Sequence, residues 1–138
     1  MTRLPARAVY EARTRDILVR VQPQYLPAQS DPAQEQYTFA YTVEIENHGT
    51  ETAQLISRHW IITDGHGRVE EVKGPGVVGE QPTLKPREAF RYTSGCPLKT
   101  PTGEMRGSYR MVTDEGDVFD VEIPAFSLHT PDAVKRMN

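Results

Sequence analysis

The sequence has a single cysteine, Cys96, and no long apolar run. One cysteine cannot form an internal disulfide, which excludes a disulfide-stapled secreted fold and fits a reducing compartment. No stretch approaches the roughly 20 apolar residues of a membrane span, and residues 1–7 lack the apolar core of a secretory signal. The 138 residues are enough to bury a core without a disulfide or a metal. We therefore expect one cytoplasmic domain that has no membrane partner.

An excess of charge of one sign is also missing. Sixteen Lys and Arg stand against 19 Asp and Glu, a net charge of −3, which provides no basic field for binding nucleic acid specifically. Positive charge gathers only in residues 1–20, where five arginines face two carboxylates. Such charges are usually hydrated. We expect a flexible N-terminal tail over residues 1–14, a folded domain over residues 15–130 and a C-terminal tail over residues 131–138.

Long helical periodicity is absent, and alternation with period two dominates instead. In residues 37–46, aromatic and β-branched side chains alternate with Thr, Ala and Glu. Because successive side chains of a strand point to opposite faces, this pattern predicts a half-buried strand of an antiparallel sheet. Comparable strand patterns, separated by turn residues, occupy residues 17–21, 55–63, 68–72, 88–94, 105–113 and 118–123. About seven short strands predict an all-β fold, an antiparallel β-sandwich of the immunoglobulin or fibronectin type III kind.

Two aromatic residues fit a sandwich. Trp60 lies in the middle of a predicted strand, where such folds often bury a tryptophan between their sheets. Tyr109 lies on the penultimate strand, where a corner tyrosine bonds back to the backbone. Both residues are equally compatible with ordinary places in an aromatic core.

The segment Gly74 to Gly79 reads Gly-Pro-Gly-Val-Val-Gly, which matches the letters of the G-x-G-x-x-G dinucleotide fingerprint. A working fingerprint joins a strand to a helix, whose first amides face a pyrophosphate. Here Pro75 removes one amide, and two further prolines, Pro82 and Pro86, prevent a long helix from starting. The glycines therefore predict a loop between strands rather than a dinucleotide-binding turn.

A weaker interpretation of this loop is an anion site. Glycine-rich loops without a helix can form concavities of backbone amides that hold anions. The candidate ligand-binding residues are Gly74, Gly76, Gly79, Lys73, Arg68 and Arg87. The alternative is that the three glycines only let a long loop turn, which is the commonest use of glycine.

The remaining reactive side chains form no recognisable catalytic or metal-binding pattern. The four histidines have no helical i, i+4 spacing and no H-E-x-x-H motif, although His48 and His66 both lie in predicted turns. Cys96 has no neighbouring base in the sequence, and no serine lies in a G-x-S-x-G elbow. We therefore expect a protein that is not an enzyme and that needs no metal and no cofactor.

Sandwich domains without a catalytic site commonly serve in recognition. An exposed sheet edge pairs with an incoming strand, and loops present side chains to a partner. The mildly polar face made by Thr38, Ala40 and Thr42 is one candidate surface, and plain solvated sheet is its alternative. Unpaired edges would also allow a homodimer.

Several segments together resemble the bacterial ApaG proteins. The resemblance covers about residues 15–130 and rests on the following segments: residues 58–65 (Arg-His-Trp-Ile-Ile-Thr-Asp-Gly), 77–82 (Val-Val-Gly-Glu-Gln-Pro), 92–95 (Tyr-Thr-Ser-Gly) and 107–109 (Gly-Ser-Tyr). The resemblance implies an ApaG domain with a fibronectin type III-like sandwich and no established enzymatic activity. Related domains in larger eukaryotic proteins imply protein binding.

The same resemblance also bears on the glycine loop, since Gly74, Gly76 and Gly79 match the glycine motif of the family. That motif has prompted proposals of pyrophosphate or nucleotide binding, and the family has been linked to the handling of cobalt and magnesium. We therefore expect a binding module with an unknown protein partner. The alternative is a module that binds a phosphate-containing small molecule at the glycine loop, with a link to divalent cations.

Overall fold

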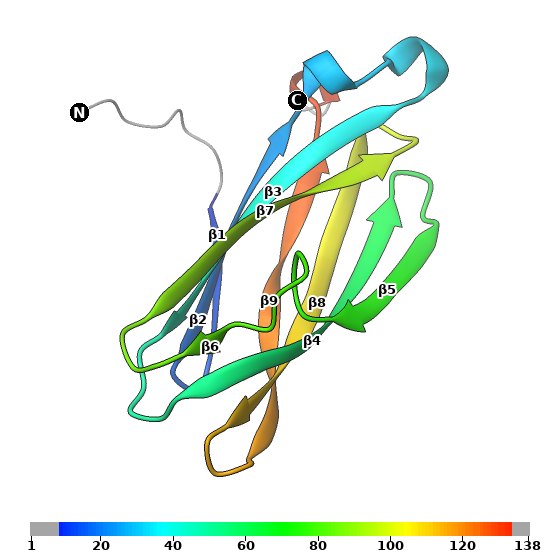
Figure 1. The fold of residues 1–138 in the computed structure, drawn as a ribbon. Coiled ribbons are helices and arrows are strands. Elements are labelled where there is room, and N and C mark those ends of the chain that lie inside the picture. Colours follow the sequence, from blue (N-terminus) through cyan, green and yellow to red (C-terminus); the bar gives the residue numbers. More distant parts are fainter. Residues whose placement is uncertain (1–8, 134–138) are drawn as a thin grey trace, which may run out of the picture.

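The computed structural model describes residues 9–133, which form two antiparallel sheets packed face to face (Figure 1). The first sheet has the strand order β1-β2-β3-β7, and the second has the order β5-β4-β8-β9, with β6 paired to β4. The strands are β1 (Tyr10–Thr14), β2 (Ile17–Tyr25), β3 (Tyr37–Asn47), β4 (Ala53–Asp64), β5 (Val69–Pro75), β6 (Thr83–Leu84), β7 (Ala89–Leu98), β8 (Thr102–Thr113) and β9 (Val118–His129). Two short 3₁₀ turns, η1 (Pro27–Gln29) and η2 (Pro32–Gln34), lie between β2 and β3. The all-β sandwich expected from the sequence is confirmed.

The core lies between the two sheets, as period-two alternation requires. From Thr38 to Asn47 of β3 the half-buried and buried residues alternate without a break. Trp60 of β4 is 3 % exposed and packs edge-on against Tyr41 of the opposite sheet, with 5.2 Å between ring centroids. The prediction that Trp60 is buried between the sheets is confirmed. The corner role considered for Tyr109 is wrong, because its hydroxyl bonds the Tyr92 hydroxyl and not the backbone.

The N-terminal boundary differs from the expected one. Residues 10–14, placed in a flexible tail by the sequence reasoning, form β1 and pair with β2. Arg20 joins the two strands, since its Nε donates to Glu11 at 2.6 Å. The side chains of β1 alternate between half-buried and exposed, but five residues rich in polar groups carry too weak a signal to be recognised alone. Residues 1–8 of the expected tail lie outside the described residues.

The other expected boundary lies near the end of the chain. Residues 131–133 are helical, with Ala133 buried, and residues 134–138 lie outside the described part. Within residues 9–133, no helix is long and apolar enough to cross a membrane.

Strand β2 is longer than predicted because it runs through Pro23. The sequence pattern placed this strand over residues 17–21, but Pro23 pairs with Tyr41 of β3. On the other side of β2, the pairing with β1 extends only as far as Val21, which lies opposite Tyr10. Among residues 9–133 no strand pairs with this side of β2 at Pro23, so its missing N–H lies at an edge, which is where a strand tolerates proline.

The two long sides of the sandwich are closed differently. On one side β1 lies against β9, and the Glu122 N–H donates to Thr14 Oγ1 at 3.0 Å. On the other side, the edges of β7 and β5 stay apart, and the loop between β5 and β6 lies in front of the opening (Figure 1). This open side and the neighbouring faces of the sheets hold the candidate functional features.

Candidate functional site

The glycine segment forms the end of β5 and the loop that follows it. Gly76, Val78 and Gly79 have positive φ angles of 60°, 43° and 82°. Val77 and Glu80 exchange two backbone hydrogen bonds, of 2.8 Å and 2.9 Å, around a tight turn. The next element is β6, so no helix begins at Gly79. The prediction of a loop between strands is confirmed, and the helix that a dinucleotide fingerprint needs is absent from this described segment.

Several amides of the loop already have acceptors within the protein. The Gly76 N–H donates to Ile56 O at 2.8 Å, and the amides of Val77 and Glu80 bond each other's carbonyls. The carbonyls of Pro75 and Gly76 both accept from Nη1 of Arg58, at 2.9 Å and 3.0 Å. An anion cradle needs converging free amides. This loop instead presents carbonyl oxygens to a cation, and the cation is its own Arg58.

The glycines make room for these contacts. A Cβ atom on Gly76 would lie 2.2 Å from the carbonyl oxygen of Glu80, and a Cβ on Gly74 would lie 3.0 Å from the Arg58 guanidinium. A Cβ on Gly79 would meet nothing within 4 Å, so Gly79 serves its positive φ alone. All three glycines therefore have a conformational or steric reason that involves no ligand.

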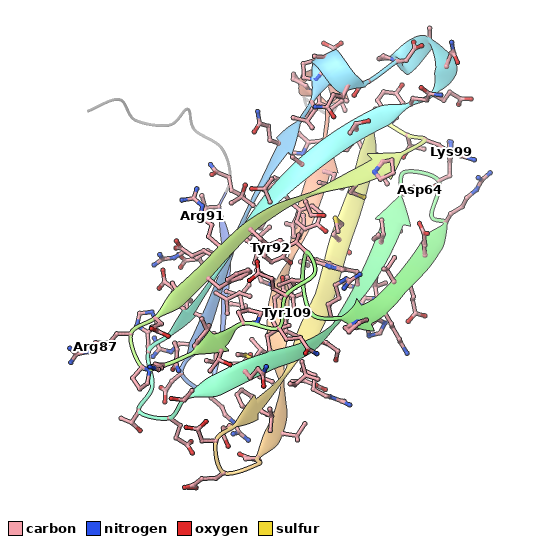
Figure 2. The ribbon with its side chains drawn as sticks, viewed as in Figure 1. Asp64, Arg87, Arg91, Tyr92, Lys99 and Tyr109 are labelled. Carbon is pink, nitrogen blue, oxygen red and sulfur yellow. The ribbon has the colours of Figure 1, made fainter. Side chains whose placement is uncertain are left out.

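The loop covers a buried pair of tyrosines (Figure 2). Val77 is 1 % exposed and belongs to the core cluster beneath the loop. The hydroxyls of Tyr92 on β7 and Tyr109 on β8 bond each other across the two sheets. Burial raises the pKa of Tyr92 and of Tyr109, and the nearby charge of Arg58 opposes part of that increase. Both hydroxyls are therefore held in the neutral form.

The six predicted ligand-binding residues are only partly brought together. Lys73 precedes Gly74 on β5, but its side chain lines the outer face of the second sheet and not the glycine loop. Arg68 lies in the turn between β4 and β5, where its carbonyl accepts from the Asp64 N–H. Arg87 precedes β7, and Figure 2 shows it on the opposite side of the molecule from Asp64. Arg68 and Arg87 therefore cannot serve one site together with the glycine loop.

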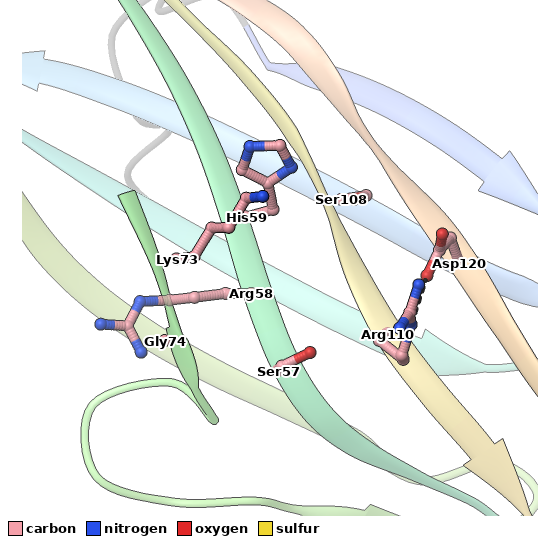
Figure 3. A pocket seen from close by; sticks show the side chains of 8 residues that line it. All are labelled: Ser57, Arg58, His59, Lys73, Gly74, Ser108, Arg110 and Asp120. Carbon is pink, nitrogen blue, oxygen red and sulfur yellow. Dashed lines mark hydrogen bonds and ion pairs between the residues drawn. The ribbon is translucent and has the colours of Figure 1, made fainter. Parts of the chain in front are cut away.

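Sequence reasoning missed a hollow of about 260 Å³ on the outer face of the second sheet (Figure 3). We call this depression the outer hollow. Its polar lining consists of Ser57, His59, Lys73, Ser108, Arg110 and Asp120. Arg58 and Gly74 also border it, but the Arg58 guanidinium is turned toward Gly74 and the glycine loop (Figure 3).

A β-bulge creates the outer hollow. In the pairing of β4 with β8, the register shifts between Leu55 and Ser57, so that one extra residue, Ile56, is inserted. Leu55 is fully buried, and simple alternation would turn Ser57 inward as well. The bulge sends Ser57 and His59 to the outer face and turns Arg58 toward the loop. The only sequence signal for this site is the polar run Ser57-Arg58-His59 in the middle of an apolar strand.

Strand β7 has a free edge. It pairs with β3 over its whole length and with no other strand of the described residues. The bond from the Asn47 N–H to Glu88 O (3.0 Å) sets the alternation of the ladder. Every second residue from Ala89 onward therefore turns its backbone groups away from β3. We call this set the free edge of β7, which comprises Ala89, Arg91, Thr93 and Gly95.

Three further reactive side chains, Cys96, His48 and His59, are buried or hydrogen-bonded. Cys96 is buried, and desolvation raises the pKa of its thiol to about 11, which disfavours the nucleophilic thiolate. His48 bonds Glu46 and His59 bonds Glu71, each at 2.7 Å. Within residues 9–133 no group of three or more His, Cys, Asp or Glu is placed to hold a metal ion.

Comparison with known proteins gives a consistent result. The family model described as the ApaG domain matches residues 27–113. The chain is 67 % identical over 131 residues to Protein ApaG of Caulobacter vibrioides, covering 95 % of this chain and 94 % of that protein. It is 58 % identical over 130 residues to Protein ApaG of Rhodospirillum centenum, covering 94 % and 100 %.

Solved structures agree with this match. The crystal structure of an ApaA protein from Bordetella pertussis superposes with a TM-score of 0.82 at 60 % identity, covering 84 % of this chain and 94 % of that one. The C-terminal domain of wzt superposes with a TM-score of 0.52 at 10 % identity, which shows a shared fold alone.

Proposed function

Because the chain belongs to the ApaG domain family, we propose that it is a non-enzymatic binding module that holds an extended segment of another protein along the free edge of β7. The observation that carries this proposal is the free edge itself. Among the described residues, its backbone groups take part in no hydrogen bond with a second strand. An incoming strand would satisfy them by main-chain pairing, which is the basis of strand addition.

The sheet face beside this edge is suited to such a partner. Thr38, Ala40 and Thr42 of β3 lie opposite Pro97, Gly95 and Thr93 of β7. All six residues are small and uncharged, and the Thr42 and Thr93 hydroxyls bond each other at 2.9 Å. Charge appears only further along, at Glu44 and Arg91. A neutral face next to an unpaired edge repels few partner side chains by charge. A partner strand is therefore recognised mainly through its backbone.

The other edge on the open side is less suited to strand addition. Strand β5 has seven residues, includes three charged side chains and ends in Gly74-Pro75, while β7 has ten residues. Charged residues and proline are the common means of protecting an edge from further pairing. The proposal therefore assigns the partner to β7 and not to β5.

This proposal assigns no chemical step to the protein. The buried Cys96 thiol has a raised pKa, the wrong direction for a nucleophile. The second candidate, a phosphate-containing ligand held by the glycine loop, receives little support from the amides of that loop, since three of them already donate to backbone carbonyls.

Thr93 offers a clean test of the β7 proposal. Thr93→Pro removes an N–H that faces away from β3, in the same row as the natural Pro97, so the sandwich should still fold. Thr93→Val is the matched control, because it loses the same hydroxyl bond to Thr42 but keeps the N–H. Crosslinked pull-downs from native extract, followed by hydrogen exchange on the recovered complex, should give a partner with wild type and Thr93→Val. With Thr93→Pro we expect about a tenfold lower yield, because a carbonyl of the partner strand is left without its N–H donor.

In the same complex, we expect the amides of Arg91, Thr93 and Gly95 to gain protection from exchange. Equal recovery by Thr93→Pro, or protection confined to another strand, would remove the β7 assignment. Recovery of this chain alone as its own partner would replace the proposal with a homodimer.

A further inference from the structure

The outer hollow lies on the sheet opposite to β7, so its role is independent of the strand-addition proposal. It exists because two small residues stand among long ones. Ser57 lies opposite Pro75 and Arg110, and Ser108 lies opposite His59. The longer side chains of His59, Lys73 and Arg110 stand beside these two serines in the lining of the hollow (Figure 3).

The hydrogen-bond donors of the outer hollow are unused within the described residues. The Lys73 ammonium and the hydroxyls of Ser57 and Ser108 have no hydrogen-bond or ion-pair partner in residues 9–133. Arg110 directs Nε to Asp120 Oδ1 at 3.1 Å, which leaves its two Nη groups available. Four groups that can only donate, or that donate readily, therefore line one depression.

The charges around the outer hollow favour an anion. Lys73 and Arg110 are its cations, and Asp120 is the only carboxylate in its lining. Asp120 is occupied by Arg110, and Glu71 just outside the hollow is occupied by His59. Lys73 is thus the lining charge that has no partner in residues 9–133, on a chain of net charge −3, while the carboxylate of Glu122 lies opposite Ser108 on β9.

We propose that the outer hollow binds the phosphate group of a small molecule. Lys73 and Arg110 pair with the phosphate charge, and Ser57 and Ser108 donate their hydroxyl hydrogens to its oxygens. This combination suits phosphate, which has several strong acceptor oxygens and pairs well with a guanidinium fork and an ammonium point charge. The bulge at Ile56 is the structural device that assembles the site, since it brings Ser57 to the same face as Ser108.

Amide chemical shifts of ¹⁵N-labelled full chain will test this assignment at constant ionic strength. The probes are inorganic phosphate, glycerol phosphate and pyrophosphate, so that the series separates a phosphomonoester site from a pyrophosphate site. We expect saturable shifts confined to residues 57–59, 73–74 and 108–110. Shifts confined to residues 76–80 would move the site to the glycine loop and overturn this inference, as would a flat response at millimolar ligand.

Substitutions give the second readout. Lys73→Gln should raise the Kd for phosphate about tenfold, which corresponds to the loss of one charge-assisted hydrogen bond, and Ser57→Ala with Ser108→Ala should raise it by a similar factor. Lys99→Gln is the matched control, because Lys99 is also exposed but lies outside the outer hollow, and it should leave the Kd unchanged. Equal weakening by Lys73→Gln and Lys99→Gln would show only general attraction to positive charge and would overturn the site.

Discussion

The glycine loop and the outer hollow lie on opposite sides of β4 and β5, and their polar groups are used in opposite ways. Arg58 and His59 are neighbours in the sequence, but the Arg58 side chain points to the loop and the His59 side chain lines the outer hollow. In the loop, the Arg58 guanidinium and at least three amides are bound to backbone carbonyls. In the outer hollow, an ammonium and two hydroxyls have no partner within residues 9–133.

This difference shows how to interpret a glycine motif. Glycines mark places where the backbone needs a positive φ or a close approach, and those needs are fully met here by internal contacts. The ability to bind a ligand depends on donors and charges that the fold leaves unsatisfied. We therefore expect substitutions around the loop to change stability and substitutions in the outer hollow to change binding.

The largest expected effect on stability is that of Gly76→Ala. The substitution places a Cβ 2.2 Å from Glu80 O at a φ of 60°, so the Val77–Glu80 turn must open. We expect a loss of about 2–3 kcal/mol in the free energy of unfolding, measured by urea denaturation. Gly79→Ala is the control, because its Cβ meets nothing within 4 Å and only backbone strain remains, at about 1 kcal/mol. Equal losses from the two variants would contradict the steric role of Gly76.

The sequence predicted the loop but not the outer hollow, for a physical reason. Pro75 and Pro82 exclude a helix by their chemistry alone, so the conformational role of the glycines could be inferred without coordinates. The long strands were also predictable, because apolar and polar side chains alternate in segments such as residues 37–46. Ser57 was not predictable, since an inserted residue at a bulge reverses the face of every residue after it.

The ends of the sandwich illustrate the same limit. Strand β1 depends on pairing with β2 and on contacts with β9, which are non-local, and its own five residues give little signal. Arg68 and Arg87 looked close to the glycines along the chain, but a hairpin and a loop carry them to different parts of the molecule (Figure 2). Proximity in sequence is a poor guide to a site that is assembled across strands.

A smaller effect is expected for Arg58→Met, which sharpens the comparison between the two sides of β4. Methionine keeps the apolar stem but leaves the carbonyls of Pro75 and Gly76 without their shared donor. We expect a loss of about 1.5–2 kcal/mol by urea denaturation. Arg110→Met is the control on the outer face. Its ion pair with Asp120 is more than half exposed, so the change should stay within about 0.5 kcal/mol. Similar losses for the two variants would mean that the loop gains no special stability from its arginine.

The smallest effect at neutral pH is expected beneath the loop, for Tyr92→Phe. This variant leaves the buried Tyr109 hydroxyl without its partner, at a cost of about 1 kcal/mol at pH 7. The clearer signature is at alkaline pH. Because burial raises the pKa of both tyrosines in the folded state, the unfolded chain loses these protons first as the pH rises.

Stability from each of these tyrosines is therefore complete below the ordinary tyrosine pKa of about 10 and is lost progressively above it, at about 1.4 kcal/mol per pH unit for each group. Tyr92→Phe removes one such group, so its free energy of unfolding should fall less steeply above pH 10 than that of wild type, measured by urea denaturation at a series of pH values. Tyr37→Phe is a matched control, since Tyr37 is only partly buried and lies away from the pair. An identical alkaline slope in wild type and Tyr92→Phe would show that water reaches the tyrosine pair beneath the glycine loop. The polar groups on the loop side of β4 would then not be sealed from solvent, and the contrast between the loop and the outer hollow would be lost.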